Sequence, residues 1–138
     1  MKSVALAVVA CLLLSITILT GCSTDIPVYS LNQKFTLSPG KSAVIESEDM
    51  TITFDKVLND SRCPESVTCI WAGQVQVLVT IELDGRKETL TLTQSGLTGD
   101  PASQLYEKYV LEFNISPYPQ TEQTIRVADY RLEITVRI

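Results

Sequence analysis

Histidine is absent from the 138-residue chain, and this absence removes the commonest general base and the commonest metal ligand of proteins. Basic residues are scarce as well, since 11 Lys and Arg face 16 Asp and Glu and give a formal charge of −5. Recognition of nucleic acid requires clustered cations that contact phosphates. The composition therefore argues against a nucleic-acid partner. The length suffices for one domain.

After the first 21 residues no segment keeps a 3.6-residue apolar period, so helix is expected to be nearly absent. The N-terminus itself is apolar, because Lys2 precedes an uncharged run over residues 4–19. That run is short for a membrane span of about 20 residues and is typical of a signal peptide. It ends with Leu-Thr-Gly-Cys at residues 19–22, which resembles a bacterial lipobox.

The lipobox resemblance implies that residues 1–21 are removed and that the thiol of Cys22 carries diacylglycerol, which makes the membrane a partner. An ordinary secretory signal and a transmembrane anchor are the alternatives. Residues 22–33 are interpreted as the acylated cysteine and a polar tether. Ser23 stands where aspartate retains many lipoproteins in the inner membrane, so the resemblance implies the outer membrane in a two-membrane cell. The predicted location is the cell membrane or the outer membrane, facing the periplasm or the cell exterior.

Cysteine usage is consistent with export. Cys11 leaves with the signal peptide and Cys22 carries the lipid, so Cys63 and Cys69 remain as an even pair. In an oxidising compartment these two thiols are expected to form a disulfide. A zinc site is disfavoured, because two cysteines without histidine do not supply four ligands. The spacing also differs from the C-x-x-C of redox dithiols. We predict neither a metal nor a cofactor.

Residues 34–138 are predicted to form one domain of short strands. The strongest alternation runs over residues 75–83, where five aliphatic side chains share one face. Asp84 and Gly85 then predict a type I′ hairpin turn. Pairing about this turn places Val79 opposite Leu90, so that apolar side chains meet on one face of the hairpin.

Weaker signals complete the predicted fold. The apolar parity changes after Phe54, which predicts a β-bulge at residues 55–56. Residues 94–103 are interpreted as a loop, residues 117–119 as a bend with two prolines, and residues 125–127 as a brief strand. About seven or eight short strands predict an all-β fold, a single antiparallel β-sandwich of immunoglobulin-like architecture, with a partly closed barrel as second choice.

Residues 60–73 contain the disulfide cysteines and the only tryptophan. One interpretation packs Trp71 against the disulfide at the edge of the core, where a lone strand tryptophan is usually buried. The simplest role for Arg62 is a surface ion pair with Asp60. The other interpretation is a binding loop, held rigid by the disulfide and a proline with its charges displayed. It comprises Arg62, Pro64, Glu65 and Trp71.

Residues 60–73 also carry the motif Asp-Ser-Arg-Cys-Pro-x-x-Val-x-Cys-x-Trp-x-Gly. This motif resembles the signature of small uncharacterised bacterial lipoproteins and exported proteins. A Pro-Tyr-Pro at residues 117–119 and an Asp-Tyr at residues 129–130 belong to the same resemblance, which covers most of the mature chain. The resemblance implies a fold and a compartment, and it implies no function.

The first functional hypothesis is a lipid-anchored, non-catalytic binding or structural module with an envelope protein as partner. The alternative is an inhibitor of an extracytoplasmic hydrolase, a lysozyme or a protease. Loss of Lys2 with the signal peptide leaves 10 cations against 16 anions, and this charge of −6 suits a cationic lysozyme. An enzyme ranks third, because Asp55, Asp60 and Glu65 supply carboxylates but no spacing selects them.

Overall fold

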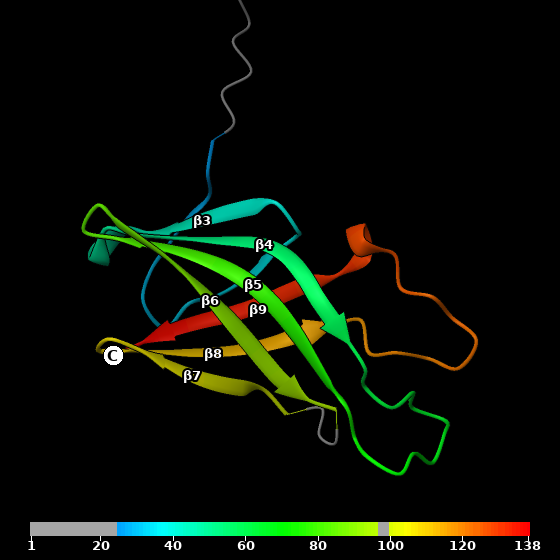
Figure 1. The fold of residues 1–138 in the computed structure, drawn as a ribbon. Coiled ribbons are helices and arrows are strands. Elements are labelled where there is room, and N and C mark those ends of the chain that lie inside the picture. Colours follow the sequence, from blue (N-terminus) through cyan, green and yellow to red (C-terminus); the bar gives the residue numbers. More distant parts are fainter. Residues whose placement is uncertain (1–24, 97–99) are drawn as a thin grey trace, which may run out of the picture.

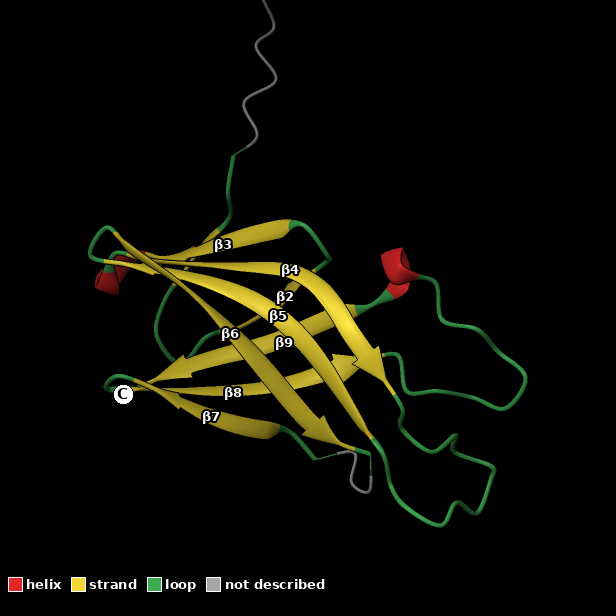
Figure 2. Cartoon of the chain, viewed as in Figure 1, coloured by secondary structure: helices red, strands yellow, loops and turns green. Residues whose placement is uncertain are grey.

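The computed structural model describes residues 25–96 and 100–138, which form two β-sheets packed face to face (Figure 1 and Figure 2). The predicted all-β sandwich is confirmed. Helical structure in the described residues consists of two short 3₁₀ turns, η1 (Glu46–Glu48) and η2 (Val127–Asp129). None of it is long and apolar enough to cross a membrane. The predicted signal peptide and the predicted lipid on Cys22 lie outside the described residues.

The two sheets have five and four strands. The first has the order β1-β3-β4-β5-β6 and the second the order β2-β9-β8-β7. Paired strands are antiparallel, apart from β1 and β3, which run parallel. The strands are β1 (Val28–Tyr29), β2 (Lys34–Leu37), β3 (Lys41–Ile45), β4 (Met50–Asp60), β5 (Gln74–Leu83), β6 (Arg86–Ser95), β7 (Ala102–Tyr106), β8 (Tyr109–Ser116) and β9 (Arg131–Arg137).

The domain begins earlier than predicted. β1 lies inside the expected tether of residues 22–33 and pairs with the end of β3. The ring of Tyr29 stacks on that of Phe35, with 4.7 Å between the centroids, and Leu31 also packs against the core. The tether prediction is therefore wrong for residues 28–33. This short segment has no period of its own, and its apolar side chains are accommodated by the edge of the sandwich.

β5 and β6 form the predicted hairpin in the predicted register. Val79 lies opposite Leu90. Asp84 and Gly85 have φ angles of 51° and 74°, the positive values that a type I′ turn requires. The hairpin supplies the inner strand β5 and the edge strand β6 of the five-stranded sheet, and its open end leads into the cysteine-containing segment.

β4 contains two register shifts against β5, one between Phe54 and Lys56 and one between Val57 and Asn59. The first is the predicted bulge. Up to Phe54 the apolar side chains of β4 are buried, and beyond it the strand bends (Figure 1), as bulged strands do. The bend places Asp60, the last residue of β4, against the other sheet, where the hydroxyl of Tyr130 donates to its carboxylate.

Alternate side chains of both sheets fill the core between them. The chain differs from prediction in two further places. Of the predicted loop of residues 94–103, residues 94–95 end β6 and residues 102–103 begin β7, whose inward Gln104 and outward Leu105 hide its alternation. Residues 125–127 form no strand and lead instead into η2.

Candidate functional site

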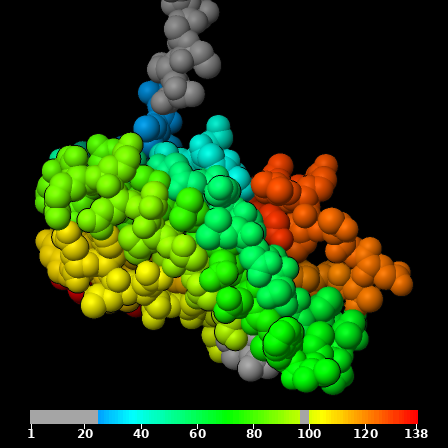
Figure 3. Space-filling model, in the orientation of Figure 1, coloured from blue at the N-terminus to red at the C-terminus, as the bar shows by residue number. Residues whose placement is uncertain are grey.

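Two loops project from the same end of the sandwich (Figure 1 and Figure 3). The cysteine loop, residues 61–73, joins β4 to β5, and the proline loop, residues 117–125, follows β8. The backbone N–H of Glu65 donates to the carbonyl of Pro119 at 3.2 Å. Gln120 Nε2 donates to Glu65 Oε2 at 2.5 Å. The two loops therefore form one continuous surface.

The predicted disulfide is confirmed, since Cys63 and Cys69 are bonded with their Cα atoms 5.9 Å apart. The seven-residue ring that it closes stabilises the fold by about 2–2.5 kcal/mol on the chain-entropy model. Backbone bonds continue the β4–β5 ladder into the loop. The N–H of Ser61 donates to Gln74 O at 2.8 Å, and that of Cys63 donates to Ala72 O at 2.9 Å. The base of the loop is thus fixed covalently and by hydrogen bonds.

Arg62 points into the domain. Its side chain is 2% exposed and that of Asp60 is 8% exposed. Two hydrogen bonds join them, from Nε to Oδ1 at 2.9 Å and from Nη2 to Oδ2 at 2.6 Å. The guanidinium also donates to the carbonyls of Ile115 and Pro117, at 2.8 and 2.9 Å. The prediction that Arg62 displays its charge is therefore wrong, and its ion pair with Asp60 is buried and not at the surface.

Two tyrosines complete the surroundings of this pair. The hydroxyl of Tyr130 donates to Asp60 Oδ2 at 2.9 Å. The ring of Tyr118 lies against Arg62, with 5.1 Å between the guanidinium carbon and the ring centroid, which is a cation–π contact. The Tyr118 hydroxyl also lies 2.5 Å from the carbonyl oxygen of Gly96, just beyond β6. Through these contacts the ion pair links the end of β4 to both loops, to the ends of β6 and β8, and to the start of β9.

Burial and charge act in opposite directions on Asp60. Burial opposes its ionisation, but the hydrogen bonds and the charge of Arg62 outweigh burial and hold the pKa of this carboxyl below its usual range. Burial and the hydrogen bond to Asp60 raise the pKa of Tyr130 to about 12. At neutral pH the cluster therefore contains an ionised pair and a neutral phenol. Removal of one partner from such a pair leaves a buried charge without compensation.

Two glycines permit the close backbone approach around Arg62. Gly73 has a φ of +68°, and a Cβ there would lie 1.8 Å from Ser61 O. A Cβ at Gly96 would lie 2.2 Å from Ala72 O. Both distances are far below van der Waals contact, so neither position admits a side chain without moving the backbone. The last residue of the 60–73 motif is thus required by the packing of the loop base.

The short motifs that carry the resemblance meet at the ion pair. Asp60, Arg62 and Gly73 belong to the cysteine motif, Tyr118 to Pro-Tyr-Pro, and Tyr130 to Asp-Tyr. The sequence did not predict that these three motifs meet, because strand periodicity does not specify which loops contact each other. The two tyrosines were missed as site residues, although the Pro-Tyr-Pro and Asp-Tyr segments that contain them had been noted in the sequence.

The tip of the cysteine loop is apolar and faces solvent. Trp71 is 80% exposed, Ile70 is fully exposed and Val67 is 45% exposed. The prediction that Trp71 packs at the edge of the core is therefore wrong, because Arg62 and Tyr118 fill the space beneath the loop. An exposed Trp71 is compatible with the other interpretation of residues 60–73, a binding loop that includes this residue.

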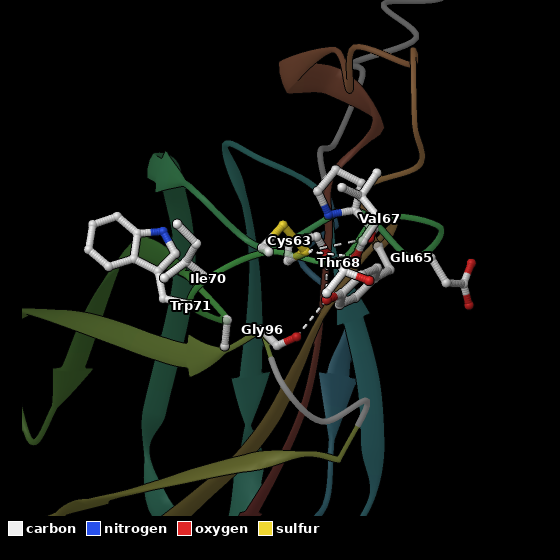
Figure 4. Close-up of a pocket in the computed structure, with 11 residues that line it drawn as sticks. Cys63, Glu65, Val67, Thr68, Ile70, Trp71 and Gly96 are labelled. Atoms are coloured by element: carbon white, nitrogen blue, oxygen red, sulfur yellow. Dashed lines mark hydrogen bonds between the residues drawn. A yellow bond between two sulfur atoms is a disulfide. The ribbon is translucent and has the colours of Figure 1, made fainter.

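A hollow of about 920 Å³ lies beside the tip (Figure 4). Trp71 and Ile70 stand on one side of it and Glu65 on the other, with Val67 and Thr68 between them. It is open, both apolar and polar groups line it, and it can receive side chains of another molecule. Its lining consists of Cys63, Pro64, Glu65, Val67, Thr68, Cys69, Ile70, Trp71, Ala72, Gly96 and Tyr118.

The carboxylates considered for catalysis have different partners. Asp55 accepts a hydrogen bond from the hydroxyl of Thr80 at 2.7 Å, whereas Asp60 is bound to Arg62 and Glu65 to Gln120. Within residues 25–96 and 100–138, no three His, Cys, Asp or Glu side chains form a group that could hold a metal ion. The site offers apolar contact area beside a carboxylate.

Comparison of the chain with models of protein families, with curated proteins and with solved structures gives no match. The interpretation of the site therefore depends on its own geometry.

Removal of Arg62 tests the buried pair. In the Arg62→Leu variant the carboxylate of Asp60 loses its partner, and we expect the free energy of unfolding in urea to fall by about 3–5 kcal/mol. Arg126→Leu is a matched control, because Arg126 and Asp129 form the same two-bond geometry with side chains that are 81% and 41% exposed. That exposed pair contributes about 0–1 kcal/mol. Equal losses in the two variants would contradict the assignment.

The raised pKa of Tyr130 predicts a loss of stability in alkali. The unfolded chain releases this proton near the ordinary tyrosine pKa of about 10, whereas the folded protein keeps it up to about 12. Between about pH 10 and about pH 12 the unfolded state binds fewer protons than the folded state, so the free energy of unfolding falls as pH rises. Urea titrations over this interval should show a shallower decline for Tyr130→Phe. An unchanged decline would mean that the pKa of Tyr130 is not raised in the folded protein.

Proposed function

We propose that the protein is a lipid-anchored, non-catalytic binding module of the cell envelope, and that it recognises a protein partner through the tip of the cysteine loop. The observation that carries the proposal is the exposure of Trp71 and Ile70 on a loop with a rigid base. Tryptophan is enriched among the residues that dominate binding energy at protein interfaces.

The construction of the loop favours binding. Exposed apolar side chains at a projecting tip gain about 25 cal/mol for each Å² that a partner covers. The disulfide and the Asp60–Arg62 pair hold the backbone beneath them, so little conformational entropy is lost when a partner docks. Because the base is fixed independently of the tip, Trp71 and Ile70 are not required for folding and are available for recognition.

The anchor is proposed from the sequence. Residues 23–27 separate Cys22 from β1, and such a segment reaches about 20 Å when fully extended. A lipid on Cys22 therefore keeps the domain close to its membrane. β1 lies at an edge of the five-stranded sheet. Figure 1 shows the first described residues, in blue, on the opposite side of the domain from the cysteine loop, so the tip faces away from the anchored side.

The second candidate function is inhibition of an extracytoplasmic hydrolase. The specific observation in its favour is that the tip projects from the body of the domain (Figure 3), a shape that can enter an active-site cleft. This candidate uses the same surface and differs in its consequence for the partner. Assays of lysozyme and serine protease activity with added protein distinguish it, because a binding module without inhibitory function leaves both rates unchanged.

The anchor is tested by substitution of Cys22. We expect wild-type protein to partition into the detergent phase of a membrane extract, because acyl chains contribute about 0.8 kcal/mol per buried CH₂. Cys22→Ser should lack the acyl chains and retain residues 1–21, as mass spectrometry would show. Cys11→Ser is the control and should behave as wild type. Wild-type protein in the aqueous phase would contradict the lipoprotein interpretation.

The tip is tested by the double variant Ile70→Ser and Trp71→Ser. We expect capture of an envelope protein by the immobilised variant to fall at least about tenfold, since anchor residues contribute about 2 kcal/mol or more. The melting temperature should stay close to that of wild type, because both side chains are exposed.

Leu105→Ser is the matched control for the tip variant. Leu105 is 69% exposed on β7, so its loss removes exposed apolar surface away from the loop. Capture by this variant should equal that of wild type. A tip variant that captures as well as wild type, or a control that loses capture equally, would place the binding surface elsewhere.

A further inference from the structure

The exposed charges of residues 61–73 and 117–125 are of one sign, and the exposed Arg126 that follows them is paired with Asp129. In the cysteine loop and the proline loop, all of whose residues are described, the single cation is Arg62, and it is buried and paired with Asp60. Glu65 and Glu122 are exposed. A molecule that approaches the two loops therefore meets carboxylates beside apolar side chains, with no exposed cation among these residues.

Apolar and acidic groups stand on opposite sides of the same hollow. Trp71 and Ile70 are on one side and Glu65 is on the other, with its carboxylate directed outward from the rim (Figure 4). Glu65 is held in place, because its backbone donates to Pro119 O and its carboxylate accepts from Gln120. The hydroxyls of Ser66 and Thr121 form a second link between the loops. The backbone contacts and the disulfide therefore set where the two features stand on the loop before any partner arrives.

We propose that this hollow receives an extended protein segment in which a Lys or Arg side chain lies next to an apolar one. The apolar side chain packs against Trp71 and Ile70, and the cation extends over the opposite rim to pair with the outward carboxylate of Glu65. Charge complementarity of this kind selects the partner and speeds association. The inference rests on the proposed function and specifies the chemistry of the partner.

The same charges disfavour other occupants. An anionic bilayer carries a negative surface potential that attracts basic segments and repels carboxylates, so Glu65 and Glu122 oppose insertion of the tip into a membrane. A second copy of the chain would bring like charges together, since each copy displays the same carboxylates and the whole chain has a formal charge of −5. A basic, partly apolar segment satisfies both features of the hollow.

The single tryptophan of the chain makes the test direct, because fluorescence under tryptophan excitation reports on Trp71 alone. We would titrate the purified protein with three peptides of equal length that contain no aromatic residue. They alternate Lys with Leu, Glu with Leu, and Lys with Ser. We expect the Lys/Leu peptide to shift the emission to shorter wavelength in a saturable manner, and the other two to bind at least about tenfold more weakly.

Charge variants separate recognition by Glu65 from general attraction to an acidic protein. Glu65→Gln should weaken binding of the Lys/Leu peptide about twofold to fivefold, the contribution of one rim ion pair. Glu46→Gln makes the same charge change in η1, which joins β3 to β4 at the other end of β4, and should leave the affinity unchanged. Equal effects of the two variants would overturn the role of Glu65.

Other results would also overturn the inference. These are an absence of any emission shift with the Lys/Leu peptide, equal binding of the Glu/Leu peptide, a larger shift with phosphatidylglycerol vesicles, or a shift that depends on protein concentration alone. The proposed function is judged separately, by capture with the Ile70→Ser and Trp71→Ser variant. If the tip variant loses capture and the peptides fail, the binding module stands and only this partner chemistry is wrong.

Discussion

The ion pair between Asp60 and Arg62 holds together the end of the sandwich from which both loops project. Its two charges are buried, and each is compensated by neighbours from different parts of the chain. Asp60 accepts from Tyr130 at the start of β9, and Arg62 donates to two carbonyls at the end of β8. Within the described residues every buried side-chain nitrogen and oxygen has a partner. Such a pair is costly to break, because each charge depends on the other.

This constraint explains how a small domain can expose a tryptophan without loss of order. The disulfide closes the outer ring of the cysteine loop, and the ion pair and Tyr118 hold its base. The space under the loop is filled, so Trp71 and Ile70 remain outside. An ordered loop with exposed apolar side chains keeps its shape whether or not a partner is bound, which is the basis for our proposal that the tip is a recognition surface.

The sequence was informative where one side-chain period decides the structure. The register of β5 and β6, the turn at Asp84 and the bulge after Phe54 all agree with prediction. It was least informative at the loops. The exposure of Trp71 and the burial of Arg62 depend on contacts between segments more than fifty residues apart, which no local pattern contains. By average burial, tryptophan is expected inside a protein and arginine at its surface. Here tertiary packing reverses both expectations.

Amide hydrogen exchange at the base of the cysteine loop tests most directly whether the ion pair holds this end of the molecule. The N–H groups of Cys63 and Gly96 donate to Ala72 O and Gly73 O, at 2.9 and 3.0 Å. In Arg62→Leu these two amides should exchange faster by a larger factor than amides of the β5–β6 hairpin, because the opening is local to the loop base. If their exchange is unchanged, or rises only as much as that of the hairpin, the pair does not hold the loop and the account is wrong.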